Sequence, residues 1–112
     1  MLRRFVILSI FVLALTASSS SAYDTRATIS GKVSDSNKQA IVGAIVKAVN
    51  VETNQITKAK TTTGGHFTLP FLNPGTYNLE VTAKGFQTLN RDRLVVRVAD
   101  KINLLLEMKV DE

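Results

Sequence analysis

The chain has 112 residues, of which 45% are hydrophobic, with fourteen Lys and Arg, nine Asp and Glu, and no cysteine. This length suits one domain rather than two. The absence of cysteine excludes a disulfide scaffold, a thiolate zinc site, a cysteine nucleophile and a lipidated N-terminal cysteine. The one long apolar run, residues 5–17, is shorter than the roughly 20 residues that cross a bilayer as a helix, which excludes a multi-span membrane protein.

The N-terminus is predicted to be a secretory signal peptide. Two arginines at positions 3–4 precede the apolar run, and Ser20 and Ala22 satisfy the small-x-small rule for a cleavage site. We therefore assign residues 1–22 to a cleaved signal peptide and residues 23–112 to the mature domain, with no transmembrane span in the mature chain. The alternative is an uncleaved N-terminal anchor, for which the apolar run is short.

Charge and composition also bear on the compartment and the partners. Cleavage would remove two of the fourteen basic residues and no acidic one, so the net charge would fall from +5 to +3, and we expect no nucleic-acid partner. An exported domain without cysteine suits a bacterial envelope better than an animal secretory pathway, in which small domains are usually disulfide-bonded. The expected location is the periplasm, the outer-membrane surface or the extracellular medium.

From residue 27 onward, hydrophobic and polar residues alternate in short runs that are rich in Val, Ile, Thr and Phe and are interrupted by Gly, Pro, Asn and Asp. No segment there has a convincing helical period. The runs predict seven strands, the sixth in one or two pieces around a charged stretch, at residues 28–34, 44–51, 56–62, 66–70, 77–83, 86–98 and 102–110. Short strands with a turn signal about every ten residues predict an all-β fold, a seven-stranded sandwich of two sheets.

Two pairs of residues predict the type of turn. Gly64 and Gly65 permit the positive φ of a tight hairpin connection between the third and fourth strands. Pro74 and Gly75 fit the second and third positions of a type II turn before the fifth strand.

Side chains two positions apart share a face of a strand, and this rule predicts the core. Both faces of the second strand carry apolar residues, and we choose the face of Ala44, Val46 and Ala48. Tyr77 is expected to be buried, with its hydroxyl paired. Other strands contribute further residues that we expect to face inward, namely Ile29, Gly31, Val33, Phe67, Leu69, Leu79, Val81, Ile102, Leu104, Leu106, Met108 and Val110.

Glycine, proline and aromatic residues recur at set spacings through these strands and turns. The segments are 29–35 (Ile-Ser-Gly-Lys-Val-Ser-Asp), 43–46 (Gly-Ala-Ile-Val), 65–70 (Gly-His-Phe-Thr-Leu-Pro), 72–77 (Leu-Asn-Pro-Gly-Thr-Tyr) and 83–86 (Ala-Lys-Gly-Phe). Over about residues 27–110 they resemble the carboxypeptidase regulatory-like domain. The resemblance implies a transthyretin-like (prealbumin-like) seven-stranded sandwich, which is also grouped with carbohydrate-binding-like folds. The version here is most similar to the copy that precedes the plug of certain TonB-dependent outer-membrane receptors.

The chain departs from that family pattern in three loops. Val42 stands where proline usually precedes Gly-Ala, and Lys38 stands where glycine commonly breaks the first loop. An acidic residue or asparagine before the Gly-x-Phe element is replaced by residues 62–64. We expect these loops to differ in shape and the strands to be unaffected.

The family name does not imply an activity for this chain. In the metallocarboxypeptidases that give the name, the domain sits beside a separate catalytic domain, and this sequence contains none of its motifs. His66 is the single histidine, and it belongs to no His-Glu-x-x-His motif. We expect it to face solvent beside a turn. The prediction is therefore a protein that is not an enzyme, with no catalytic residue, metal ligand or cofactor.

Four basic side chains are the candidate binding residues. Lys58, Lys60, Arg91 and Arg93 recur at spacings of two, which would stack them on one face of a strand. Such a basic face could bind an anionic glycan or a lipid headgroup. The alternative is a solvated outer face whose charges discourage edge-to-edge pairing of strands.

An intramolecular isopeptide bond is a further hypothesis, because some related bacterial surface domains join a Lys of the first strand to an Asn of the last. Lys32, Asn103 and the acid Glu80 are the residues in suitable strands. All three fall on the outward phase of their strands, whereas this chemistry needs a desolvated site. The outward phase argues against the bond.

Two classes of function remain open. The first is a non-catalytic, extracytoplasmic binding or assembly module of the bacterial envelope, with an envelope protein or a glycan as its partner. The second is a detached N-terminal extension of a TonB-dependent receptor, which would have no complete function alone.

Overall fold

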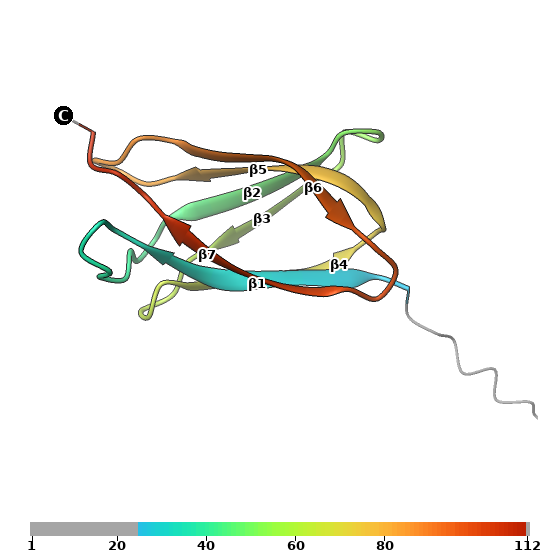
Figure 1. Cartoon of the computed structure of the whole chain (residues 1–112), viewed down its shortest axis with the longest axis horizontal. Coiled ribbons are helices and arrows are strands. Elements are labelled where there is room, and N and C mark those ends of the chain that lie inside the picture. Colours follow the sequence, from blue (N-terminus) through green and yellow to red (C-terminus); the bar gives the residue numbers. More distant parts are fainter. Residues whose placement is uncertain (1–24, 112) are drawn as a thin grey trace, which may run out of the picture.

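The structure, a computed structural model, describes residues 25–111. In this part of the chain there are seven β-strands and no helix, so no described helix is long and apolar enough to cross a membrane. The strands are β1 (Ala27–Ser34), β2 (Ile45–Asn50), β3 (Ile56–Lys60), β4 (His66–Leu72), β5 (Gly75–Thr82), β6 (Leu89–Val96) and β7 (Lys101–Glu107) (Figure 1). The predicted signal peptide, residues 1–22, lies outside the described residues.

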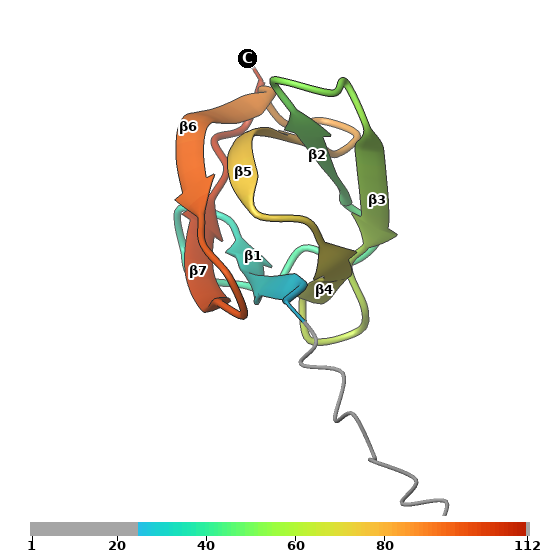
Figure 2. The same ribbon diagram turned by 90° about the vertical axis from the view of Figure 1, so that its right-hand side faces the viewer.

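The strands form two layers that face each other (Figure 2). One sheet has the order β4-β1-β7, and the other has the order β3-β2-β5-β6. β1 and β7 run parallel, whereas every other neighbouring pair is antiparallel. The predicted all-β fold, a seven-stranded sandwich of two sheets, is confirmed.

The core lies between the sheets, because each inner face carries the apolar half of an alternating strand. In β1 the side chains alternate strictly between buried and half-buried. In β2 the predicted face of Ala44, Val46 and Ala48 is fully buried, whereas Ile45 is 41% exposed. Other predicted core residues that are also buried are Ile29, Gly31, Val33, Phe67, Leu69, Leu79, Val81, Leu106 and Met108.

Gly31 allows the three strands of the smaller sheet to approach closely. It lies opposite Leu104 on β7 and opposite Phe67 on β4. A Cβ atom at this position would overlap the Leu104 carbonyl oxygen and lie 3.0 Å from the Phe67 ring. Only glycine avoids that overlap without moving a strand.

Two buried hydroxyl groups fasten the ends of strands. Tyr77 is 2% exposed, and its hydroxyl donates a hydrogen bond to the Asn73 carbonyl oxygen at 2.7 Å, which confirms the predicted pairing. Thr61 is 4% exposed. Its Oγ1 accepts from the Ala44 N–H at 2.9 Å and donates to the Ile41 carbonyl oxygen at 2.6 Å. This residue therefore holds the segment before β2 against the end of β3.

The predicted turns are corrected by the structure. Gly65 has a φ of 76°, as a tight turn requires, but the turn joins β3 of one sheet to β4 of the other. The predicted hairpin is therefore wrong, because the two strands belong to different layers. The predicted type II turn is also wrong, since Gly75 has a φ of 158° rather than the roughly +80° of that turn type. Gly75 is instead the first residue of β5.

The last two strands also differ in part from the prediction. β6 is one strand with a bulge in the charged stretch, but it spans Leu89–Val96 rather than the predicted residues 86–98. Val110 lies beyond β7 and is 56% exposed. Ile102 and Leu104 lie on the inner side of β7, yet they are only half-buried, because β7 is the last strand of its sheet and part of its inner side is uncovered.

Candidate functional site

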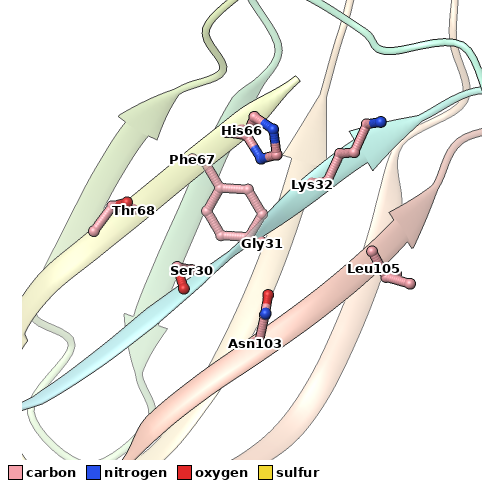
Figure 3. Close-up of a pocket in the computed structure, with 8 residues that line it drawn as sticks. All are labelled: Ser30, Gly31, Lys32, His66, Phe67, Thr68, Asn103 and Leu105. Atoms are coloured by element: carbon pink, nitrogen blue, oxygen red, sulfur yellow. The ribbon is translucent and has the colours of Figure 1, made fainter. Parts of the chain in front are cut away.

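The outer face of the three-stranded sheet carries a shallow depression of about 320 Å³. Figure 3 shows side chains from all three strands around it. The residues that line it are Ser30, Gly31, Lys32, His66, Phe67, Thr68, Asn103 and Leu105. We call the six of these that belong to the outward phase of their strands the polar face: Ser30, Lys32, His66, Thr68, Asn103 and Leu105.

Strand register arranges the polar face in two rows. Ser30 of β1 pairs with Thr68 of β4 on one side and with Asn103 of β7 on the other. Directly opposite residues on neighbouring strands lie about 5 Å apart. The first row therefore places two hydroxyl groups and a carboxamide side by side across the sheet.

The second row combines basic and apolar groups. Lys32 pairs with His66 on β4 and with Leu105 on β7. Lys32 is half-buried, whereas Leu105 is 81% exposed. This row supplies a cation, an imidazole and an apolar surface next to the hydroxyl groups of the first row.

The polar side chains of this face make no hydrogen bond within the described part of the chain. Among the described residues, none of the side chains of Ser30, Lys32, His66, Thr68 and Asn103 makes a hydrogen bond to another residue. Hydroxyl and carboxamide groups both donate and accept hydrogen bonds, and the lysine donates only. The face can therefore bind a ligand that presents hydroxyl or carbonyl groups.

His66 is exposed, as predicted, at the start of β4 beside the Gly64 turn. The residues around it on the polar face offer no carboxylate and no thiol. Within residues 25–111, no group of three or more His, Cys, Asp or Glu side chains lies close enough to hold a metal ion.

The structure does not bring the four predicted basic binding residues together. Lys58 and Lys60 lie on β3, at one edge of the four-stranded sheet, whereas Arg91 and Arg93 lie on β6, at the other edge. β2 and β5 separate the two pairs. A spacing of two also no longer implies that Arg91 and Arg93 share a face of β6, because a bulge interrupts the alternation there. Binding of an anion by either pair stays a prediction.

The three residues of the isopeptide hypothesis are likewise divided. Lys32 and Asn103 both border the depression on the three-stranded sheet. Glu80 lies on β5, in the other sheet, where it pairs with Lys47 of β2. An acid that assists the reaction would have to lie beside the lysine and the asparagine. This arrangement does not form the site.

Sequence analysis did not single out the other members of the polar face. Ser30, Thr68 and Leu105 are ordinary strand residues, and nothing in their own spacing joins them. The outward phase of each strand is visible in the sequence. The order β4-β1-β7, which makes neighbours of the three strands, is not.

The chain belongs to the carboxypeptidase regulatory-like domain family, whose model matches residues 28–109. This family is a regulatory or binding type of domain and is not catalytic. The resemblance seen in the sequence is thus confirmed. No curated protein matches the chain at a significant level.

Solved structures share the fold at low sequence identity. A proposed carbohydrate-binding protein from Bacteroides uniformis is similar with a TM-score of 0.60 and 17% identity, over 74% of this chain and 41% of that one. The minor pilin of Streptococcus agalactiae has a TM-score of 0.62 and 12% identity, over 79% and 46%. Catechol 1,2-dioxygenase from Pseudomonas arvilla has a TM-score of 0.62 and 10% identity, over 84% and 55%.

These structural relatives are longer than the region they share with this chain. The chain spans less than two thirds of each of the three proteins. At such identities the likeness defines the fold, a β-sandwich that occurs in binding proteins, surface proteins and enzymes alike. The dioxygenase shares only this fold with the chain, since chemistry resides in particular sites and not in a fold.

Proposed function

We propose that the protein is a non-catalytic binding module of the bacterial cell envelope and that its polar face contacts the partner. The observation that carries this proposal is the double row of side chains on the outer face of the β4-β1-β7 sheet. Five polar side chains converge there without a hydrogen-bonding partner among the described residues. An array of unused donors and acceptors around a shallow depression is suited to a polar ligand.

The chemistry of the polar face favours binding over catalysis. General acid–base or nucleophilic catalysis needs an acid, a base or a nucleophile within hydrogen-bonding reach of one another. The rows pair Ser30 with Thr68 and Asn103, and they pair Lys32 with His66 and Leu105. Neither row contains a carboxylate that would orient His66 or accept a proton. The face is therefore built to donate and accept hydrogen bonds.

The ligand we propose is a glycan or a protein surface that carries hydroxyl or carbonyl groups. The hydroxyl groups of Ser30 and Thr68 and the carboxamide of Asn103 match the hydrogen-bonding groups of a sugar. Leu105 offers an apolar patch for a C–H face of the sugar or for an apolar side chain of a protein. The similarity to a proposed carbohydrate-binding protein supports a glycan as the ligand, and the similarity to a minor pilin supports a protein surface.

A comparison of two asparagine variants tests the proposed site. We would screen the purified protein against a glycan array and an envelope extract, together with Asn103→Ala and the matched control Asn90→Ala. Asn90 is also an exposed asparagine on a strand, but it lies on β6 of the other sheet. We expect Asn103→Ala to weaken retention about fivefold to tenfold, as the loss of one hydrogen bond of about 1 kcal/mol predicts, and Asn90→Ala to leave it unchanged. Equal retention of both variants would contradict the site.

The same capture separates the proposed module from the alternative of a receptor extension. A specific glycan or an envelope protein retained through Asn103 supports the module. Retention of a TonB-dependent barrel that does not depend on Asn103 would favour the receptor extension instead.

Export to the envelope is part of the proposal, and it rests on the signal-peptide pattern of residues 1–22. N-terminal sequencing of the protein from an envelope fraction should give Tyr23 as the first residue. Recovery of a chain that begins at Met1 from the cytoplasmic fraction would contradict export.

A further inference from the structure

The sandwich has four edge strands, and three of them carry features that hinder pairing with another strand. β3 has only five residues and exposes Lys58 and Lys60. β4 contains Pro70, which has no N–H to donate, next to a bulge at which Phe71 has a φ of 58°. β6 is bulged where Arg93 has a φ of 59°. Lysines, proline and bulges are the features by which natural sheets prevent edge-to-edge association.

β7 is the exception among the four edges. Its seven residues keep one uninterrupted parallel register with β1, and they contain no proline. Thr28 N–H bonds to the Asp100 carbonyl oxygen, and Met108 N–H bonds to the Ser34 carbonyl oxygen. Backbone groups alternate in direction along a strand. The even-numbered residues of β7 therefore bond to β1, and the odd-numbered residues direct their N–H and C=O groups to the open edge.

Partly covered apolar side chains follow the same side of the sandwich. β6 and β7 are the last strands of their sheets, and they lie on one side of the molecule (Figure 2). Leu89 and Leu94 of β6, like Ile102 and Leu104 of β7, pack against the core but stay half-buried. Leu105 on the outer face of β7 is 81% exposed. A strand added to β7 would cover part of this apolar surface.

We propose that β7 pairs with β7 of a second copy of this chain, in an antiparallel register centred on Leu104. In that register Lys101 lies opposite Glu107 of the second copy, and Glu107 lies opposite Lys101 of the second copy. Directly opposite residues of opposite charge stabilise a strand pair. Asn103 then lies opposite Leu105 of the second copy. The outward N–H and C=O groups of all four odd-numbered residues face each other, as an antiparallel ladder requires.

The charges on β7 are the reason for choosing a second copy as the partner. A shift of the register by two residues in either direction leaves Lys101 or Glu107 opposite an uncharged residue, and a shift by one residue breaks the hydrogen-bonding phase. The strand is therefore complementary to itself in one register, which is the property that a two-fold symmetric interface needs.

Pairing would join the two three-stranded sheets into one continuous sheet. The polar faces of the two copies would then lie next to each other, because Asn103 and Leu105 belong both to β7 and to the polar face. The dimer would present two adjacent copies of the proposed ligand site. Pairing of β7 does not depend on that ligand, so failure of the proposed ligand site would not contradict the proposed dimer, and the reverse also holds.

Charge reversal on β7 provides the test. We would measure association of the purified protein by sedimentation equilibrium for wild type, Lys101→Glu, Glu107→Lys and the double variant. Both residues are exposed, and circular dichroism would verify the fold of each variant. We expect a wild-type dimer, a rise in the dissociation constant of about tenfold for each single variant because two attractions become repulsions, and recovery in the double variant. A mixture of the two single variants should form a mixed dimer.

The matched control is Lys58→Glu, which makes the same charge change on the edge strand β3 and should leave the dissociation constant unchanged. A wild-type protein that stays monomeric up to millimolar concentration would overturn the proposal. A dimer that is unaffected by Lys101→Glu, or that is weakened equally by Lys58→Glu, would overturn it as well.

Discussion

β6 and β7 are both edge strands on the same side of the sandwich, with eight and seven residues respectively, yet their edges are built differently. β6 carries three consecutive charged residues, Arg91, Asp92 and Arg93, and a bulge, whereas β7 is regular and exposes Leu105 next to its central residue. The freedom of an edge strand to pair is therefore decided locally, by charge and backbone regularity, and not by its place in the fold.

In the bulge on β6, a backbone N–H group has a hydrogen-bond acceptor within the same sheet. The Arg93 N–H donates to Oδ1 of Asn78 on the neighbouring strand β5, at 3.0 Å. An N–H that bonds to a side chain of the same sheet is not offered to an additional strand. On β7 the N–H groups of the odd-numbered residues point away from β1, and among the described residues no side chain accepts a hydrogen bond from them.

The largest expected effect is the difference in stability between substitutions on the two faces of β7. Leu106→Ala should lower the free energy of unfolding by about 2–5 kcal/mol, because Leu106 is 1% exposed and its loss leaves a cavity. Leu105→Ala, at the neighbouring but 81% exposed position, should change it by less than about 0.5 kcal/mol. Urea denaturation at one low protein concentration would measure both variants, and equal losses would show that the facing of β7 is wrong.

The next effect concerns the attachment of β7 to the sheet. Gly31→Ala should destabilise the domain by about 1–3 kcal/mol, because the added methyl group overlaps the Leu104 carbonyl oxygen and forces the strands apart. Gly43→Ala serves as a spatial control, since a Cβ there meets no atom within 4 Å, although its φ of 80° adds strain. A smaller loss for Gly31→Ala than for Gly43→Ala would contradict the close approach of β1 and β7.

A smaller and opposite effect is expected on β6. Arg93 has a φ of 59°, and an L side chain in the left-handed region costs about 1 kcal/mol, which glycine does not incur. Arg93→Gly should therefore leave stability unchanged or raise it by about 0.5 kcal/mol. Arg91→Gly, at a position without positive φ, should lower stability by about 0.5–1 kcal/mol. Thermal denaturation of the pair would detect this difference in sign, and its absence would exclude the bulge.

The smallest change in stability is expected for Leu105→Lys, which adds a charge to the edge of β7 and so makes it resemble β6. Leu105→Lys places a charge on an exposed position, so the free energy of unfolding should change by less than about 0.5 kcal/mol. The same substitution should abolish the dimer, because in the proposed register the new charge would lie opposite Asn103 of the second copy, without an acidic partner. Sedimentation velocity beside a denaturation curve would show whether association is lost while stability is kept.

The strands and most of the core were predictable from the sequence, because alternation along each strand is a local property. The burial of Tyr77 follows from that period. In the second strand the period left two apolar faces, and the structure buries the chosen face of Ala44 and exposes Ile45. The short strands and the spacing of the turn signals also predicted two sheets, and the family resemblance implied the same arrangement. Both predictions are confirmed because packing agrees with the local pattern in these strands.

The remaining features depend on contacts between segments that are far apart in the sequence. Continued alternation would have placed Phe71 inside, but the bulge turns it outward, to 65% exposure, and its ring lies 4.8 Å from the Arg26 guanidinium carbon. The Gly65 turn joins two sheets, and no local signal distinguishes this connection from a hairpin. The polar face could not be predicted for the same reason, since its rows exist only once β4, β1 and β7 are neighbours.

Hydrogen exchange of the β7 backbone amides, measured as a function of protein concentration, tests whether β7 pairs with a second copy while β6 does not. We predict that the amides of Asn103, Leu105 and Glu107 exchange quickly in dilute solution and become protected as the concentration rises. The amides of Leu104 and Leu106, which bond to β1, should be protected throughout, and those of β6 should not respond to concentration. Exchange of the three odd-numbered amides at one rate at every concentration would contradict the pairing of β7 with a second copy.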